Sequence, residues 1–199
     1  AIDDAIAEAN PHAATVETGA SSSADSRFNG LTVNDVSVNI ADNDVAGITV
    51  DPTAGLVTTE AGGAATFTVV LTSQPSAEVT LGLSSSDTTE GTVSPSSLTF
   101  TSANWNTART VTVTGVDDLI VDGNVGYTIV TAAATSTDLA YNGINPADVS
   151  VTNTDNDVAG ITVAPTAGLT TTEAGGTATF TVVLNTQPTA DVSIGLSSS

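Results

Sequence analysis

The chain has 199 residues, of which 22 are acidic and only two are basic, so that its net charge is −20. This charge disfavours binding to nucleic acid or to an anionic membrane surface. The sequence contains no cysteine and no lysine, which excludes disulfides, thiolate metal sites and Lys–Asn isopeptide cross-links.

The remaining composition indicates β-structure. Hydrophobic residues make up 40% of the chain but aromatic residues only 4%, and Thr, Val, Ser and Gly are abundant, which suits half-buried strands joined by short polar turns. No segment approaches the roughly 20 consecutive apolar residues of a membrane-spanning helix. We therefore expect an all-β chain with no membrane insertion in this segment.

A seven-residue string, Asp-Asn-Asp-Val-Ala-Gly-Ile, occurs at 42–48 and again at 155–161, a spacing of 113 residues. Segments 45–86 and 158–199 differ at only nine of 42 positions, and 2–44 pairs more loosely with 116–157, with one extra residue placed near 21–24. A period of this size matches one small domain per repeat. The sequence thus predicts the back part of a repeat (1–44), a complete repeat (45–157) and the front part of a third (158–199), and we expect a window on a longer repetitive chain.

The first unit is predicted to contain two strands. Residues 1–9 have helical propensity, but the corresponding segment of the complete unit lies between an alternating Thr/Val run and a glycine, so we expect a loop. Strands are predicted at 13–18 and 33–40, separated by a polar loop at 19–30. In the second strand, alternation places Val36, Val38 and Ile40 on one face.

The complete unit is predicted to be an Ig-like antiparallel β-sandwich of about seven strands. After a short strand at 47–50 comes a turn at 51–55. The further expected strand segments are 65–71, 79–83, 92–93, 98–100, 109–114, 125–133 and 149–152. Trp105, the only tryptophan, is expected to cap the core.

Three acidic motifs in this unit resemble those of a known family. They are Glu60-Ala61-Gly62-Gly63, the loop Asp117-Asp118-x-x-x-Asp122-Gly123, and Asp155-Asn156-Asp157 before Val-Ala-Gly-Ile. In order and spacing they resemble the Calx-beta domain family, Ig-like sandwiches of sodium-calcium exchangers, of an integrin subunit and of tandem arrays in bacterial surface and secreted proteins. The resemblance implies calcium ions at one end of the sandwich.

The resemblance also implies the ligands by position. In the complete unit they are Glu60, Asp117, Asp118, Asp122, Asp155, Asn156 and Asp157 with the carbonyl of Ile120, and Asp87 or Glu90 as further candidates. Asn156 departs from the family pattern, where a third acidic residue is common, and this lowers the charge of the site. The first unit supplies Asp3, Asp4, Glu8, Asp42 and Asp44, whereas the third retains only Glu173.

The residue chemistry agrees with calcium. Ca²⁺ takes six to eight oxygen ligands, and these loops offer carboxylates and carbonyls with no competing His or Cys. Gathered at one end of a sandwich without an ion, such carboxylates would repel one another by roughly 1–4 kcal/mol per close pair. The alternative is that the acidic loops are simply solvated, or belong to a salt-adapted surface.

No combination of residues indicates catalysis. His12 is the only histidine, is paired with Gly126 in the sequence alignment of the units and is expected to be an exposed loop residue. The complete repeat has no Cys, Lys or His to act as nucleophile or base. We expect no enzyme activity.

The favoured function is a calcium-braced structural repeat of a large extracellular bacterial adhesin or surface filament, acting as a stiff spacer whose partners are neighbouring repeats or copies of the same protein. A binding module for a glycan or a protein, and a calcium-sensing domain, stay open as alternatives. Close similarity between repeats favours the spacer, because recognition of one ligand does not require copies.

Overall fold

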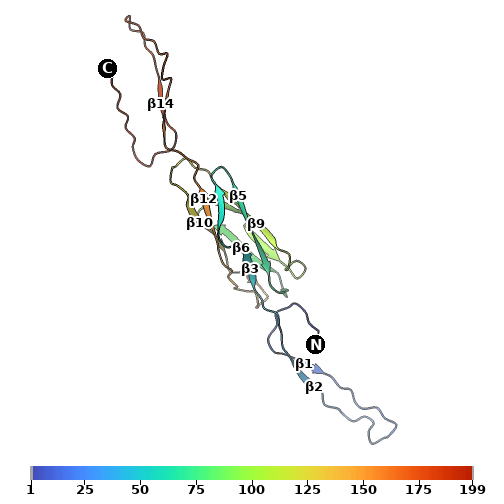
Figure 1. Cartoon of the computed structure of the whole chain (residues 1–199). Coiled ribbons are helices and arrows are strands. Elements are labelled where there is room, and N and C mark those ends of the chain that lie inside the picture. Colours follow the sequence, from blue (N-terminus) through green and yellow to red (C-terminus); the bar gives the residue numbers. More distant parts are fainter. Residues whose placement is uncertain (1, 199) are drawn as a thin grey trace.

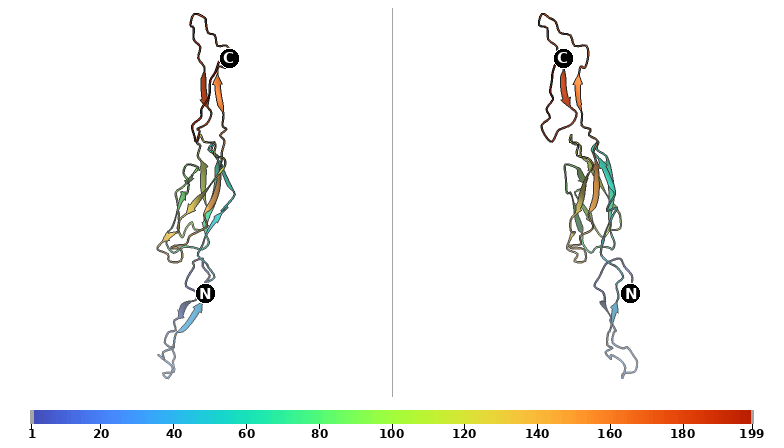
Figure 2. Two further views of the ribbon diagram at one scale, coloured as in Figure 1. Left: turned by 90° about the vertical axis from the view of Figure 1, so that its left-hand side faces the viewer. Right: turned by 60° about the vertical axis from the view of Figure 1, so that its left-hand side comes forward.

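The computed structural model describes residues 2–198 as three units placed end to end along one axis (Figures 1 and 2). A hairpin with long loops forms the N-terminal unit, a sandwich forms the central unit, and a second hairpin begins the C-terminal unit (Figure 1). All regular structure in the described residues is β-structure, and no helix there could cross a membrane. The all-β, Ig-like sandwich prediction is confirmed.

The central unit consists of two packed sheets. In the four-stranded sheet the order is β3 (Ile48–Asp51), β5 (Ala64–Leu71), β9 (Arg109–Gly115), β7 (Gly91–Ser94), all antiparallel. The six-stranded sheet has the order β11 (Thr135–Ser136), β6 (Val79–Ser85), β10 (Val125–Thr131), β12 (Val149–Thr154), β4 (Leu56–Thr59), with β8 (Ser97–Phe100) paired to β6. Its one parallel pair is β12 with β4.

Alternation along the strands explains why this sequence forms a sandwich. In β5 and β9 every second residue is apolar and faces inward, so that Phe67 lies opposite Val111, while threonines such as Thr66 and Thr112 face outward. Trp105 packs against this core as expected, and its carbonyl accepts the N–H of Leu71. The buried apolar residues are Phe67, Val69, Leu71, Val79, Leu81, Leu83, Leu98, Phe100, Val111, Val113, Tyr127, Ile129, Ala134, Tyr141, Val149 and Val151.

The two end units repeat the register of the complete one. In the N-terminal unit, β1 (His12–Val16) pairs with β2 (Val36–Ile40), and each pair lies 113 positions before a pair of β10 with β12. In the C-terminal unit, β13 (Ile161–Ala164) pairs with β14 (Thr181–Leu184), each pair 113 positions after one of β3 with β5. Each end unit therefore repeats the register of one strand pair of the complete sandwich.

Several sequence predictions are corrected by these pairings. His12 stands opposite Ile40 as Val125 stands opposite Asn153, so the extra residue of the first unit lies between Ile6 and His12 and not near 21–24. His12 thus corresponds to Val125, and it begins a strand, half-buried, instead of lying in an exposed loop. Residues 2–9 do form a loop. The strands β4 and β11 were not predicted at all.

Candidate metal centre

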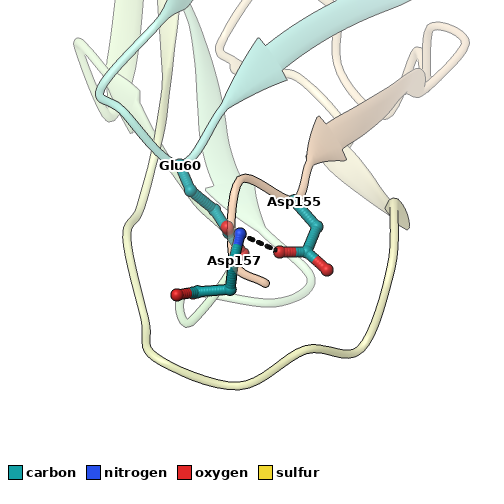
Figure 3. A group of neighbouring side chains, drawn as sticks. All are labelled: Glu60, Asp155 and Asp157. Carbon is teal, nitrogen blue, oxygen red and sulfur yellow. Dashed lines mark hydrogen bonds between the residues drawn. The ribbon is translucent and has the colours of Figure 1, made fainter. Parts of the chain in front are cut away.

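Three acidic segments meet at the end of the sandwich that faces the C-terminal unit. The parallel pairing of β4 with β12 sets Thr59 beside Thr154, so the chain leaves both strands at the same edge. Glu60 follows β4, and Asp155 to Asp157 follow β12. The loop after β9, residues 116–124, curves around them (Figure 3). The topology thus brings together residues that lie almost 100 positions apart in the sequence.

The first group consists of Glu60, Asp155 and Asp157, drawn in Figure 3. One carboxylate oxygen from each lies within 4.8 Å of the others. The backbone shapes the group, because the N–H of Asp157 donates to Asp155 Oδ1 (2.7 Å) and the N–H of Asn156 donates to Glu60 Oε2 (2.8 Å). Glu60 is only 3% exposed.

The second group consists of Glu90, Asp118 and Asp122, whose carboxylate oxygens satisfy the same 4.8 Å limit. Glu90 is 6% exposed and accepts a hydrogen bond from Asn153 Nδ2 at 3.3 Å. From the sequence, Glu90 and Asp87 were equal candidates. The structure distinguishes them, since Asp87 Oδ1 accepts the N–H and hydroxyl of Thr89 within its own turn.

Three further residues of the predicted set lie outside both groups. Asp117 Oδ1 accepts the side-chain amide of Asn156 at 3.3 Å, so these two residues contact each other at the rim. The carbonyl of Ile120 accepts the N–H of Asp122 at 3.1 Å within the loop.

Burial and mutual repulsion disfavour the charged form of several of these carboxylates. Burial, followed by the charges of neighbouring aspartates, raises the pKa values of Glu60, Glu90 and Asp157 above their ordinary range. Hydrogen bonds from the N–H groups of Asp157 and Gly123 lower the pKa of Asp155 instead. Asp157 Oδ2 is buried and has no hydrogen-bond partner among the described residues. Such a set of hard oxygen donors, one of them buried and unpaired, fits a divalent cation such as Ca²⁺.

A buried polar network supports both groups from the core side. Thr58 Oγ1 lies 3.1 Å from Tyr127 Oη and donates to Asn153 Oδ1 at 3.0 Å. Asn153 in turn donates to Glu90 and to the carbonyl of Val116. Gly115 leaves room for this packing, because a Cβ there would collide with the carbonyl of Thr59.

The N-terminal unit holds only part of a comparable site. Ile2, Asp3, Asp4, Glu8, His12, Ile40, Ala41, Asp42, Asn43 and Asp44 line a small pocket. Asp42 accepts the N–H groups of Asp44 and Glu8, as Asp155 accepts those of Asp157 and Gly123. The Glu8 carboxylate lies 3.1 Å from His12 Nδ1. The described residues of the N-terminal unit, 2–44, contain no counterpart of Glu60 or Glu90. In the third unit, Glu173 occupies the position of Glu60.

Comparisons with known proteins give a coarse likeness to β-domains. No family model matches the chain, and a search of curated proteins finds no match. Among solved structures, the apo-form Calx CBD1 domain is 14% identical over 57% of this chain and 100% of its own, with a TM-score of 0.44. Domains 4 and 5 of the S-layer protein SbsC are 25% identical over 61% of this chain and 59% of their own, with a TM-score of 0.35. The CsuC–CsuE chaperone–tip adhesion subunit complex of Acinetobacter baumannii pili is 9% identical over 56% of this chain and 58% of its own (TM-score 0.41).

Proposed function

We propose that the chain is a structural repeat of an extracellular bacterial adhesin or surface filament, in which calcium ions brace each repeat and its joint with the next. The observation that supports this best is the double role of the loop at 117–122. Asp118 and Asp122 belong to a carboxylate group, while Leu119, between them, accepts a hydrogen bond from the following unit.

The first part of the proposal is the metal chemistry. Each carboxylate group carries three negative charges when ionised, and Glu60 and Glu90 are almost fully buried. A bare group of this kind destabilises the folded chain through desolvation and repulsion. A bound cation would neutralise most of that charge and give the unpaired oxygen of Asp157 a partner. We assign one ion to each group, held by Glu60, Asp155 and Asp157 or by Glu90, Asp118 and Asp122.

The second part concerns the joint. Gln187 N–H donates to the carbonyl of Leu119 at 2.6 Å, and Ile120 forms a parallel β-bridge with Gln187. Ile120 and Val121 also line an apolar hollow with Ile161 and Leu184 of the C-terminal unit. The joint between the N-terminal and central units has the same construction. Gln74 N–H donates to the carbonyl of Ala5 at 2.6 Å, and Ile6 forms a parallel β-bridge with Gln74. An ion that fixes the loop would therefore also restrain the joint, which suits a stiff spacer.

Thermal unfolding of the 199-residue chain, followed by Trp105 fluorescence, tests the calcium assignment. Two ions that bind only the folded state add about 2.7 kcal/mol each at 100 times their dissociation constant, or about 5 kcal/mol together. At about 4 °C per kcal/mol for a domain of this size, calcium should raise the midpoint by about 20 °C over that in chelator. Magnesium should have a smaller effect, because it demands a tighter octahedral shell.

Two variants complete the experiment. Asp118→Asn removes a ligand from one group and should abolish about half of the calcium-induced rise. Glu78→Gln removes the same charge from an exposed position outside both groups and should keep the whole rise. Equal midpoints with calcium and with chelator in the unsubstituted chain would refute the proposal.

A further inference from the structure

The chain contains only two basic residues, Arg27 and Arg109, and no lysine. Serine proteases of the trypsin type bind the residue before the cleaved bond in a pocket that contains an aspartate, and they therefore cut after Arg or Lys. Two peptide bonds of the whole sequence, Arg27–Phe28 and Arg109–Thr110, meet this requirement. The two bonds lie in opposite structural settings.

Arg27 lies at the tip of the loop at 21–31, which joins β1 to β2 and projects beyond the paired strands (Figure 1). Its side chain is 81% exposed. Among residues 2–198 its guanidinium pairs with Asp25 alone, at 3.1 Å from Nε and 2.8 Å from Nη2. The N–H groups of Phe28 and Asn29 donate to the carbonyl of Asp25 and close a local turn. These hydrogen bonds all lie within the loop, so the turn can open without disturbing the pairing of β1 with β2.

The corresponding loop of the complete unit shows that this tip is exposed in a whole sandwich. The loop at 134–144 contains the same turn, closed by two hydrogen bonds to the carbonyl of Asp138. In this turn Leu139 is 88% exposed, and Ala140, at the position of Arg27, is exposed as well. The exposure of Arg27 is therefore a property of the loop.

The residue that follows the tip differs between the two loops. Tyr141 is buried, and its hydroxyl donates to the carbonyl of Ser73. Phe28 stands at the position of Tyr141 and has no hydroxyl to form this hydrogen bond. The peptide bond after Arg27 is thus held less firmly than the peptide bond after Ala140.

Arg109 lies in a paired strand. It begins β9, an inner strand of the four-stranded sheet, and stands opposite Val69 of β5. Its Nε is buried. A protease cleaves such a bond only in the opened state of the protein, so cleavage after Arg109 requires the sheet to open. In a stable domain about one molecule in 1,000 or fewer is unfolded at any time.

We propose that the loop at 21–31 is a processing site for a serine protease of trypsin-type specificity, which hydrolyses the Arg27–Phe28 bond. One water molecule is added across this bond and leaves a carboxylate on Arg27 and an amino group on Phe28. Exposed loop tips with small and polar residues are preferred sites of proteolytic cleavage, and residues 21–26 are Ser-Ser-Ser-Ala-Asp-Ser.

The cut separates β1 from β2 and leaves the complete unit intact. In a structural repeat it would provide a point of release beside a unit that resists the same enzyme. This site goes beyond the proposed function and does not depend on the metal.

Digestion of the 199-residue chain by trypsin under native conditions, with calcium present throughout and masses followed over time, tests the inference. Fragments 1–27 and 28–199 should appear together, and cleavage after Arg109 should be at least about 1,000 times slower. Arg27→Gln should leave the chain uncut over the same period. Arg27→Lys should keep the cut, because the protease pocket also accepts lysine.

Ala140→Arg is the matched control, because it places an arginine at the same point of the complete unit. It should add a second cut, after residue 140, that is slower than the cut after Arg27. An unchanged Trp105 unfolding midpoint should verify the fold of the three variants. A chain that stays intact, a first cut after Arg109, or an Arg27→Gln chain that is cut as fast as the unsubstituted one would overturn the inference.

Discussion

Tyr141→Phe should destabilise the central unit by about 2–4 kcal/mol. Tyr141 Oη donates to the carbonyl of Ser73 at 2.6 Å, accepts the N–H of Ser73 at 3.0 Å and lies 2.8 Å from Ser73 Oγ. Ser73 is fully buried, so removal of Tyr141 Oη leaves the backbone N–H and carbonyl of Ser73 without this hydrogen-bond partner and out of reach of water. The Ser73 hydroxyl can replace one partner at most. One unsatisfied buried group costs about 1–3 kcal/mol, and the lost hydrogen bond adds about 1 kcal/mol.

The assay is thermal unfolding followed by Trp105 fluorescence, in which this loss corresponds to a fall of about 10 °C in the midpoint. Phe28 occupies the position of Tyr141 in the N-terminal unit and keeps the loop's hydrogen bond to Asp25, so the ring alone is compatible with the fold. Tyr127→Phe is the control, because Thr58 is the only hydrogen-bond partner of Tyr127 Oη among residues 2–198, and Thr58 keeps its bond to Asn153. If Tyr141→Phe cost no more than Tyr127→Phe, the assignment of stability to the Ser73 contacts would be wrong.

Two further predictions concern protons and the joint. In chelator, the unfolding midpoint should rise as the pH falls from neutral toward the ordinary carboxyl pKa values of 3.8–4.5. The reason is that Glu60, Glu90 and Asp157 have raised pKa values in the folded chain, which therefore binds protons more readily than the unfolded chain. Below that range the lowered pKa values of Asp155 and Asp87 should make the midpoint fall again. Saturating calcium should remove the rise. An unfolding midpoint that decreases steadily from neutral pH in chelator would contradict this prediction. Gln187→Pro removes the N–H that donates to the carbonyl of Leu119 and should reduce the maximum dimension of the chain in small-angle scattering. Gln187→Ala keeps that N–H and should leave the maximum dimension unchanged. Equal scattering profiles for the two variants would show that this hydrogen bond does not stiffen the joint.

Strand alternation was sufficient to predict the sandwich but not all of its strands. The Thr/Val alternation of β9 and the Phe67, Val69 and Leu71 series of β5 identify buried faces directly from the sequence. The strand β4, Leu56–Thr59, was missed because four residues with two threonines at the end show no clear period. This segment forms a strand by pairing in parallel with β12, which lies almost 100 residues later in the chain.

The candidate site was predictable as a cluster but not in its details. The three acidic motifs do converge, and six carboxylates form two groups. Asp118 belongs to a carboxylate group and Asp117 does not. The sequence could not distinguish these two adjacent aspartates, because their positions depend on the curve of the loop between β9 and β10. Glu90 belongs to the second group because β7 starts beside the end of β9, with Gly91 opposite Gly115, and this pairing is a tertiary feature.

The repeated string at each joint connects the acidic cluster to the next repeat over a very short distance. Asp157 belongs to the first carboxylate group, and β13 starts at Ile161, so only residues 158–160 lie between them. Such a segment spans about 14 Å at most, which leaves little slack once Asp157 is fixed. Gly160 packs so closely that a Cβ would lie 2.5 Å from Asn185 Nδ2, and at the other joint a Cβ on Gly47 would lie 2.9 Å from Thr72 Oγ1. The joint is therefore held from two sides, by the short link after Asp157 and by the loop that carries Asp118 and Leu119, and both sides begin at the carboxylate groups.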